Sequence, residues 1–204
     1  MNYKINSERN VFPKTVIDSQ VGGNEELIKA SSAINLHNLF VEELKDIYWA
    51  EKALVNQISK MILSATSNKL IETLTIHLQQ TNEHVTRLEE VFSAIGKKVL
   101  AKKCEAIEGL IKETEGIMKE TEKGMMRDEG IILVSQKIEH YQIATYGTLC
   151  SFARTLGENG IGILLQKTLD EEYEADEQLT EIALEMQSEI VDLKHLIILS
   201  YSLN

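Results

Sequence analysis

The chain contains a single proline, Pro13, among its 204 residues. Proline interrupts helix interiors and sheet ladders, so the chain after this position can form long unbroken helices. Only 5% of the residues are aromatic, and only 11 are glycine. β-Sandwiches and barrels need many turns and favour aromatic and β-branched residues. The composition therefore argues against them and predicts an all-α protein.

Apolar residues recur at helical spacing in four long segments. The predicted helices span residues 31–65, 69–95, 128–156 and 160–186. Ser31 or Ser32 can cap the first of them, and Gly96 follows the second in the position of a C-cap glycine. All four are long enough to serve as elements of a helix bundle.

The connections between the segments predict the topology. Only Thr66-Ser67-Asn68 separates the first two helices, so they should form an antiparallel hairpin. Residues 97–127 are rich in Glu and Lys and weakly amphipathic, which predicts one or two surface helices. A simple up-down bundle does not need so long a connection. We therefore predict a ferritin-like four-helix bundle with one long crossover connection that carries a short extra helix.

The chain is expected to hold one domain, the bundle of residues 31–186. Residues 1–30 lack a helical period and are interpreted as a flexible N-terminal arm, with a helix from about Asn24 as the alternative. Residues 187–204 form a C-terminal tail that either extends the last helix or folds back.

Charge and cysteine content narrow the function. The net charge is -11, so the chain should repel phosphate backbones and anionic lipid surfaces, and no nucleic acid or membrane partner is expected. No apolar run is long enough to cross a bilayer, and no secretory signal is visible. Cys104 and Cys150 do not make a disulfide framework, which favours a cytoplasmic location.

Acids that interrupt the apolar stripes are the informative residues, because a buried charge costs free energy unless it is paired or metal-bound. Glu172 and Asp176 interrupt an otherwise leucine- and alanine-lined face of the fourth segment. Two acids four residues apart repel each other unless a cation lies between them. The other candidate ligands on the stripes are Asp46, Glu51, Gln80, His84, Glu139 and Gln142.

Carboxylates and imidazoles that converge from four helices can bind one or two metal ions, and such ligands suit iron or manganese. Other interpretations remain open at this stage. Glu51 is a ligand or a solvated edge residue, and His84 is a ligand or an interior histidine. His77 and His140 are interpreted as interior or rim residues. Arg87 can pair with a buried acid and stabilise it without any metal.

Five stretches of the sequence carry a family resemblance. They include LKDIYWAEK at 44–52, KCEAIEGLI at 103–111 and KIEHY at 137–141, with further matching residues in 77–89 and 169–180. They resemble the YciE/YciF family of ferritin-like, stress-associated bacterial proteins. The resemblance covers about residues 36–184.

The resemblance implies a homodimeric bundle related to rubrerythrins, with a ferroxidase-like dinuclear site. By position, Asp46 or Glu51 would serve from the first helix, Glu139 from the third, and Glu172 with Asp176 from the fourth. The sequence departs from the wider pattern because Glu-x-x-His is absent, and Gln80 and Gln142 stand where relatives often have Glu. Each glutamine removes a negative charge, which should lower metal affinity or reduce the site to one ion.

Two functional hypotheses follow. In the first, a metal-binding ferritin-like protein oxidises ferrous iron with dioxygen or peroxide, and Tyr48, Tyr141 or Tyr146 supports the ligands. In the second, the chain is a non-catalytic helical stress protein that acts as a dimer or as a partner-binding module.

Overall fold

The computed structural model describes the backbone of residues 14–202 and the side chains of residues 27–188, 190 and 191. This part of the chain is helical and contains no strand. Its helices are α1 (Lys14–Ser64), α2 (Asn68–Ala94), α3 (Glu105–Glu120), α4 (Met125–Thr155) and α5 (Asn159–Ser202). The predicted all-α class is confirmed.

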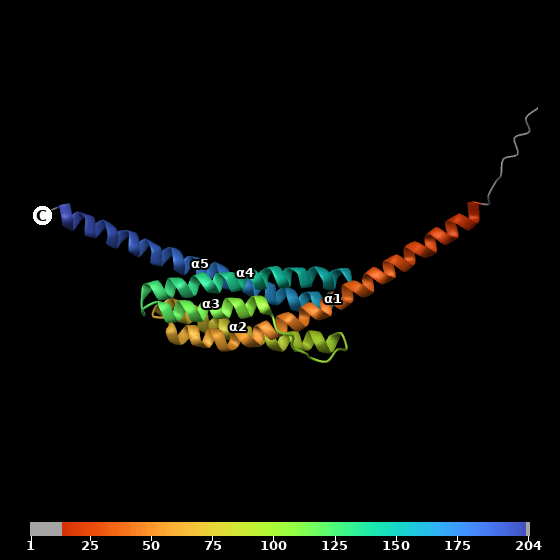
Figure 1. The fold of residues 1–204 in the computed structure, drawn as a ribbon, viewed down its shortest axis with the longest axis horizontal. Helices are drawn as coiled ribbons and strands as arrows, with labels where there is room; N and C mark the ends of the chain where they lie inside the picture. The colour runs from red at the N-terminus through yellow and green to blue at the C-terminus, as the bar shows by residue number, and fades with distance from the viewer. Residues whose placement is uncertain (1–13, 203–204) are drawn as a thin grey trace, which may run out of the picture.

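The helices form two hairpins that pack into a four-helix bundle (Figure 1). Helix α1 packs on α2, and α4 packs on α5. Further contacts join α2 to α5 and α1 to α4. The connection between the hairpins carries α3, which lies against α1 and α4. The structure thus confirms the predicted ferritin-like bundle with one crossover.

Two helix boundaries differ from the prediction. Helix α1 begins at Lys14 rather than at Ser31 or Ser32, or at the alternative start near Asn24, so residues 14–30 belong to this helix. Helix α5 continues to Ser202 instead of ending near Met186, so the tail extends the helix. Glycine disfavours a helix interior by only about 1 kcal/mol, and Gly22-Gly23 does not end α1.

The two extended helix ends project from opposite ends of the bundle (Figure 1). The predictions for residues 1–13 lie outside the described residues.

A buried aspartate closes the turn between α1 and α2. Asp128, in the first turn of α4, is 1% exposed. Its carboxylate accepts hydrogen bonds from the backbone N–H of Thr66 and Ser67, both at 2.8 Å, and from Thr66 Oγ1 at 2.6 Å. The first hairpin is thereby tied to the start of the second.

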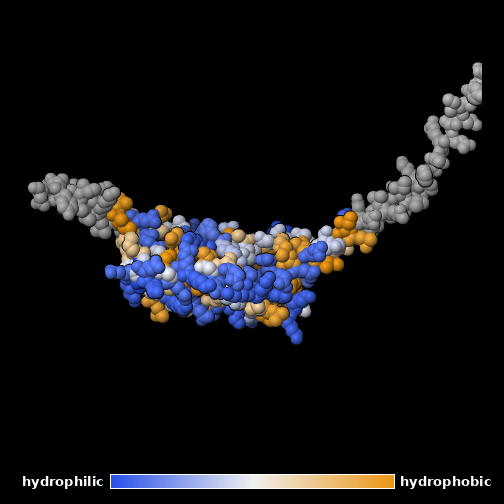
Figure 2. Space-filling model, viewed as in Figure 1, coloured by the Kyte–Doolittle hydropathy of each residue, from blue (hydrophilic) through white to orange (hydrophobic). Residues whose placement is uncertain are grey.

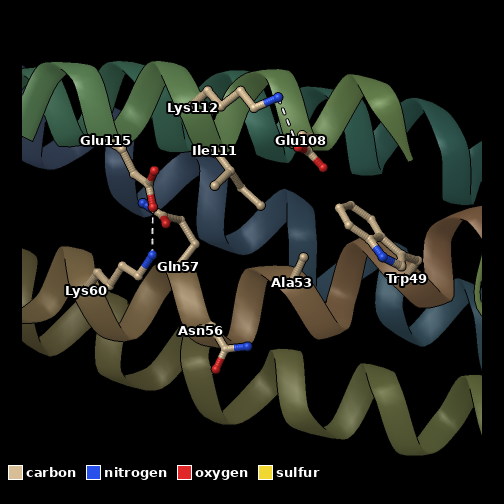
Figure 3. Close-up of a pocket in the computed structure, with 9 residues that line it drawn as sticks. All are labelled: Trp49, Ala53, Asn56, Gln57, Lys60, Glu108, Ile111, Lys112 and Glu115. Atoms are coloured by element: carbon tan, nitrogen blue, oxygen red, sulfur yellow. Dashed lines mark hydrogen bonds and ion pairs between the residues drawn. The ribbon is translucent and has the colours of Figure 1, made fainter. Parts of the chain in front are cut away.

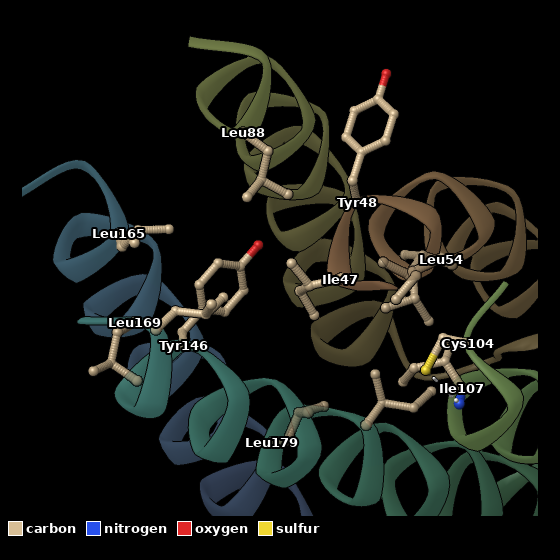
Figure 4. Close-up of a cluster of buried hydrophobic side chains, with 14 of the residues drawn as sticks. Ile47, Tyr48, Leu54, Leu88, Cys104, Ile107, Tyr146, Leu165, Leu169 and Leu179 are labelled. Carbon is tan, nitrogen blue, oxygen red and sulfur yellow. Dashed lines mark hydrogen bonds between the residues drawn. The ribbon is translucent and has the colours of Figure 1, made fainter. Parts of the chain in front are cut away.

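Apolar side chains from all five helices meet inside the bundle (Figure 4). Ile47 and Leu54 of α1 face Tyr146 of α4 and Leu169 of α5 across this core. Helix α3 contributes Ile107, which is fully buried. The core positions the backbone of all four bundle helices around one axis, so side chains that point inward must meet.

The visible surface of the bundle is mostly hydrophilic, with scattered apolar residues (Figure 2). Within residues 14–202, no helix combines the length and the apolar character that a bilayer span requires.

Candidate metal centre

Six polar residues are buried at the centre of the bundle. They are Glu51, His77, His84, Glu139, Gln142 and Glu172, each between 0% and 5% exposed. They come from α1, α2, α4 and α5. Such a concentration of buried carboxylates and imidazoles is costly in an apolar core unless the groups interact with one another or with a cation.

Glu51, His84 and Glu172 form one cluster. Each offers a ligand atom, and these atoms all lie within 4.8 Å of one another. His84 Nδ1 lies 3.3 Å from Glu172 Oε1 and 3.7 Å from Glu51 Oε1. One imidazole nitrogen and two carboxylates are suited to iron, manganese or zinc.

His77, Glu139 and Glu172 form a second cluster, whose ligand atoms also lie within 4.8 Å of one another. His77 Nε2 lies 3.2 Å from Glu139 Oε1. Glu172 belongs to both clusters, so they share one carboxylate. His77 and His84 are seven residues apart, which is close to two turns, and α2 therefore directs both imidazoles to the same side.

Two further side chains from α4 hold the acids in place. Gln142 Nε2 donates to Glu51 Oε1 at 2.9 Å and to Glu172 Oε1 at 2.7 Å. Tyr146 is fully buried, and its hydroxyl donates to Glu51 Oε1 at 2.6 Å. Gln142 thus links the acids of α1 and α5, and Tyr146 adds a second hydrogen bond to Glu51, which reduces the freedom of these acids to separate.

A series of polar contacts holds the Nε2 side of the His84 ring, opposite the two clusters. Its Nε2 donates to Glu171 Oε2 at 2.9 Å. Arg87 donates to the same carboxylate at 2.9 and 3.3 Å and also to Thr168. A carboxylate behind a metal-binding histidine fixes the ring orientation and raises its basicity. With Nε2 engaged in this way, Nδ1 remains directed at Glu51 and Glu172.

The pKa shifts differ between the residues of the two clusters and Glu171, which lies outside them. Burial disfavours a charged His84, but the carboxylates of Glu172 and Glu51 outweigh burial and raise its pKa well above the usual value. Burial raises the pKa of Glu139 strongly against the opposing effect of His77. Burial also raises the pKa of Glu172 against the opposing effect of His84.

Outside the clusters, Glu171 behaves oppositely. Burial would raise its pKa, but hydrogen bonds from His84 and Arg87 lower it to about 2. The supporting carboxylate of Glu171 is therefore held as an anion, whereas the raised pKa values of Glu139 and Glu172 favour a bound proton at these two acids unless a cation is bound.

Several buried polar atoms in the centre lack a hydrogen-bond partner among the described residues. They are Glu51 Oε2, Glu139 Oε2, Glu172 Oε2, Gln142 Oε1, His77 Nδ1 and His84 Nδ1. Buried polar groups are nearly always satisfied in folded proteins. Five of these six atoms belong to the two Glu–His clusters, and all six are oxygen or nitrogen atoms, which can bind a metal ion. This donor set fits a divalent metal ion.

The structure brings together five of the eight predicted ligands: Glu51, His84, Glu139, Gln142 and Glu172. Asp46 lies outside both clusters and accepts a hydrogen bond from Tyr141 at 3.1 Å. It precedes Glu51 by five residues, which places it about 140° away around the helix axis. Of these two acids, only Glu51 lies with the other candidate ligands in the described part of the chain.

Asp176 and Gln80 also lie outside the clusters. Asp176 belongs to neither cluster, and its Oδ2 lies 3.3 Å from Nε2 of the exposed His140, one turn beyond Glu172. Gln80 is half-buried on the flank of α2, because its neighbour Thr81 takes the fully buried position.

The sequence interpretation missed two contributors. His77, interpreted as an interior or rim residue, faces Glu139, and its seven-residue spacing from His84 was the available signal. Glu171 was not considered, because it lies on the edge of the α5 stripe beside Glu172. Arg87 does pair with an acid as expected, and that acid is Glu171.

Comparison with known proteins gives consistent matches. A family model described as a domain of unknown function, DUF892, matches residues 35–191. Protein YciF of Escherichia coli (strain K12) is 37% identical over 150 residues, which are 73% of this chain and 90% of YciF. These matches confirm the resemblance to the YciE/YciF family.

Solved structures agree with the fold. The E. coli stress protein YciF matches with a TM-score of 0.73 and 36% identity, over 75% of this chain and 97% of that one. YcfI from Rhodopseudomonas palustris matches with 0.70 and 38% identity, over 71% of this chain and 92% of that one. A Xanthomonas campestris protein at 17% identity, with a TM-score of 0.62 over 78% of this chain and 99% of that one, supports the fold alone.

Proposed function

This chain belongs to the DUF892 family, and on that premise we propose that it is a metal-binding, ferritin-like protein. The proposed activity is the oxidation of ferrous iron by dioxygen or peroxide in stress protection, in a cytoplasmic homodimer. The observation that carries the proposal is the pair of buried Glu–His clusters that share Glu172. A bound metal ion would satisfy their unpartnered oxygen and nitrogen atoms, which would explain why so many polar groups are tolerated in the core.

The proposed ligands divide between two positions. Glu51 and His84 would hold one ion, His77 and Glu139 the other, and Glu172 would bridge them. Bound iron or manganese would supply the redox chemistry. The protein's own part is to fix the donors: Gln142 and Tyr146 hold Glu51, while Glu171 orients His84.

Charge balance bears on the number of ions. The clusters contain three carboxylates, Glu51, Glu139 and Glu172. Two divalent cations would leave an excess of about one positive charge, whereas one cation would leave about one negative charge, if all three acids are ionised. Gln142 occupies the centre without contributing a charge. We therefore expect the second ion to bind more weakly than the first.

Metal analysis of protein purified with iron or manganese tests this proposal. Wild type should retain metal, and its melting temperature should rise when metal is added, because only the folded chain assembles the site. Glu51→Gln and Glu139→Gln should each weaken one position, while Glu172→Gln should weaken both. Asp176→Asn is the matched control and should bind metal normally. A metal-free wild type whose melting temperature ignores added metal would contradict the proposal.

The second candidate is a non-catalytic helical protein that acts as a dimer or partner-binding module. The observation that favours it is the hydrogen bonding of Gln142 to two acids, which partly satisfies the core without metal. In that case Glu172→Gln should strongly destabilise metal-free protein, because Gln142 loses an anionic acceptor. If the site exists for metal, the same variant should lose metal and keep most of its stability.

A further inference from the structure

A groove lies between α1 and α3, on the side of α1 that faces the crossover helix (Figure 3). Its volume is about 320 Å³. Trp49 and Ile111 point into the space between the two helices, and Ala53 lies between them on the α1 side. Aromatic and aliphatic side chains therefore form part of the wall, as in many small-molecule sites, and polar or charged side chains form the rest.

Gln57 is the unusual residue of this groove. Its side chain is 1% exposed, yet neither Nε2 nor Oε1 has a hydrogen-bond partner in the described part of the chain. A buried primary amide can make up to four hydrogen bonds, and leaving all of them unmade costs free energy. Gln57 lines the groove but its amide is covered, so a ligand can supply the missing partners once the neighbouring Lys60–Glu115 pair opens.

The charged residues of the groove are paired with each other. Lys60 Nζ lies 2.6 Å from Glu115 Oε1, and Lys112 Nζ lies 2.9 Å from Glu108 Oε1. The groove therefore has no net charge to attract an ion. The Lys60–Glu115 pair lies beside the Gln57 amide in Figure 3. Lys60 and Glu115 are both about half exposed. Because ion pairs at the surface are weak, this pair can open to admit a ligand.

From these features we propose that the groove binds a small, neutral, planar heterocycle with a lactam edge. The amide of Gln57 presents an N–H donor and a C=O acceptor side by side. Its complement is an acceptor beside a donor, which a cyclic cis-amide provides. A trans peptide directs its N–H and C=O to opposite sides and cannot pair in this way. Trp49 supplies a flat surface on which the ring stacks.

The test uses the only tryptophan of the chain, Trp49, as a local probe. The ligand is lumazine, a neutral pteridinedione in mildly acidic buffer, and the readout is the single indole N–H resonance. The matched ligand, 1,3-dimethyllumazine, keeps the rings and carbonyls but has no lactam N–H. Lumazine should shift the resonance saturably, and the dimethyl compound should bind about tenfold more weakly, as the loss of one good hydrogen bond implies.

The variant Gln57→Met keeps the length of the side chain and removes the amide. It should bind lumazine no better than the dimethyl compound, and its melting temperature should stay the same or rise. Equal binding of the two ligands, unchanged binding by the variant, or no saturable shift would overturn the proposal. A marked fall in melting temperature would also overturn it, since the amide would then have a partner within the protein. None of these outcomes depends on metal, so this inference fails or stands separately from the proposed function.

Discussion

Glu171 accepts a hydrogen bond from His84 Nε2 at 2.9 Å, and this contact decides which imidazole nitrogen faces the centre of the bundle. The opposite nitrogen, Nδ1, is thereby directed toward Glu172 at 3.3 Å. Two adjacent acids on α5 thus have different roles. Glu172 faces inward and belongs to both Glu–His clusters, while Glu171 lies on the opposite side of the histidine ring with its charge balanced by Arg87.

Replacing Glu171 with Gln should weaken metal binding by about 10- to 100-fold, the usual effect of removing a carboxylate behind a metal-binding histidine. The ring of His84 would lose its anionic partner and become a poorer donor. Competition titration with Mn²⁺ at neutral pH measures the change. Glu174→Gln, on the exposed face of the same helix, is the control and should bind like wild type. Equal affinities for all three proteins would show that Glu171 does not orient the ligand.

The low pKa of Glu171 predicts a pH-dependent contribution to stability. The pKa in the folded protein is about 2, below its usual value of 4.5, because the hydrogen bonds from His84 and Arg87 outweigh burial. Lys167 lies nearby at 3.6 Å. A lowered pKa means that ionised Glu171 stabilises the fold above pH 4.5, and that this stabilisation is lost as the pH falls toward 2.

Melting temperatures of wild type and Glu171→Gln, measured in metal-free buffer, should therefore differ most near neutral pH. The difference should shrink as the pH is lowered below 4.5. A difference that stays constant across the acid range would rule out the ionised form of Glu171 as its cause.

Asp128→Ala should destabilise the protein by about 2–4 kcal/mol. The variant leaves the backbone N–H groups of Thr66 and Ser67 without the buried carboxylate that now accepts from them. Urea unfolding gives the free-energy change. Asp170→Ala is a suitable comparison, because Asp170 is exposed and, among the described residues, accepts a hydrogen bond from Gln166 alone, one turn away. A loss no larger than that of the comparison would mean that the α1–α2 turn does not depend on α4.

Gly130→Ala should cost about 1–3 kcal/mol, as expected for overpacking. A Cβ at position 130 would lie 2.5 Å from Cγ2 of Ile117, so the Ile117 side chain or α3 itself would have to shift. Gly147→Ala, also in α4, meets nothing within 4 Å and should instead stabilise by about 0.5–1 kcal/mol. Thermal or urea unfolding of the two variants compares them directly. A Gly130→Ala variant as stable as Gly147→Ala would contradict the close packing of α3 on α4.

Much of the composition of the centre could be predicted from the polar residues that interrupt the apolar stripes. Glu172 and Glu139 each stand where a helix otherwise presents apolar residues to the core, and both are buried in the centre. His77 was harder to assign, because a lone imidazole on a buried stripe is compatible with many environments. Only its distance to Glu139 on another helix distinguishes a candidate ligand from an ordinary core histidine.

The sequence by itself determined the all-α class, the two hairpins and the crossover, because these follow from local periodicity, turn residues and the lengths of the connections. It could not determine which stripe residues meet. That depends on how far each helix is rotated about its axis and shifted along it, and both are set by packing against the other helices. A rotation of about 140° about the helix axis separates Asp46 from Glu51, and one turn along the axis separates Glu172 from Asp176. Tertiary packing therefore decided that Glu51 and Glu172 share the centre with both histidines of α2.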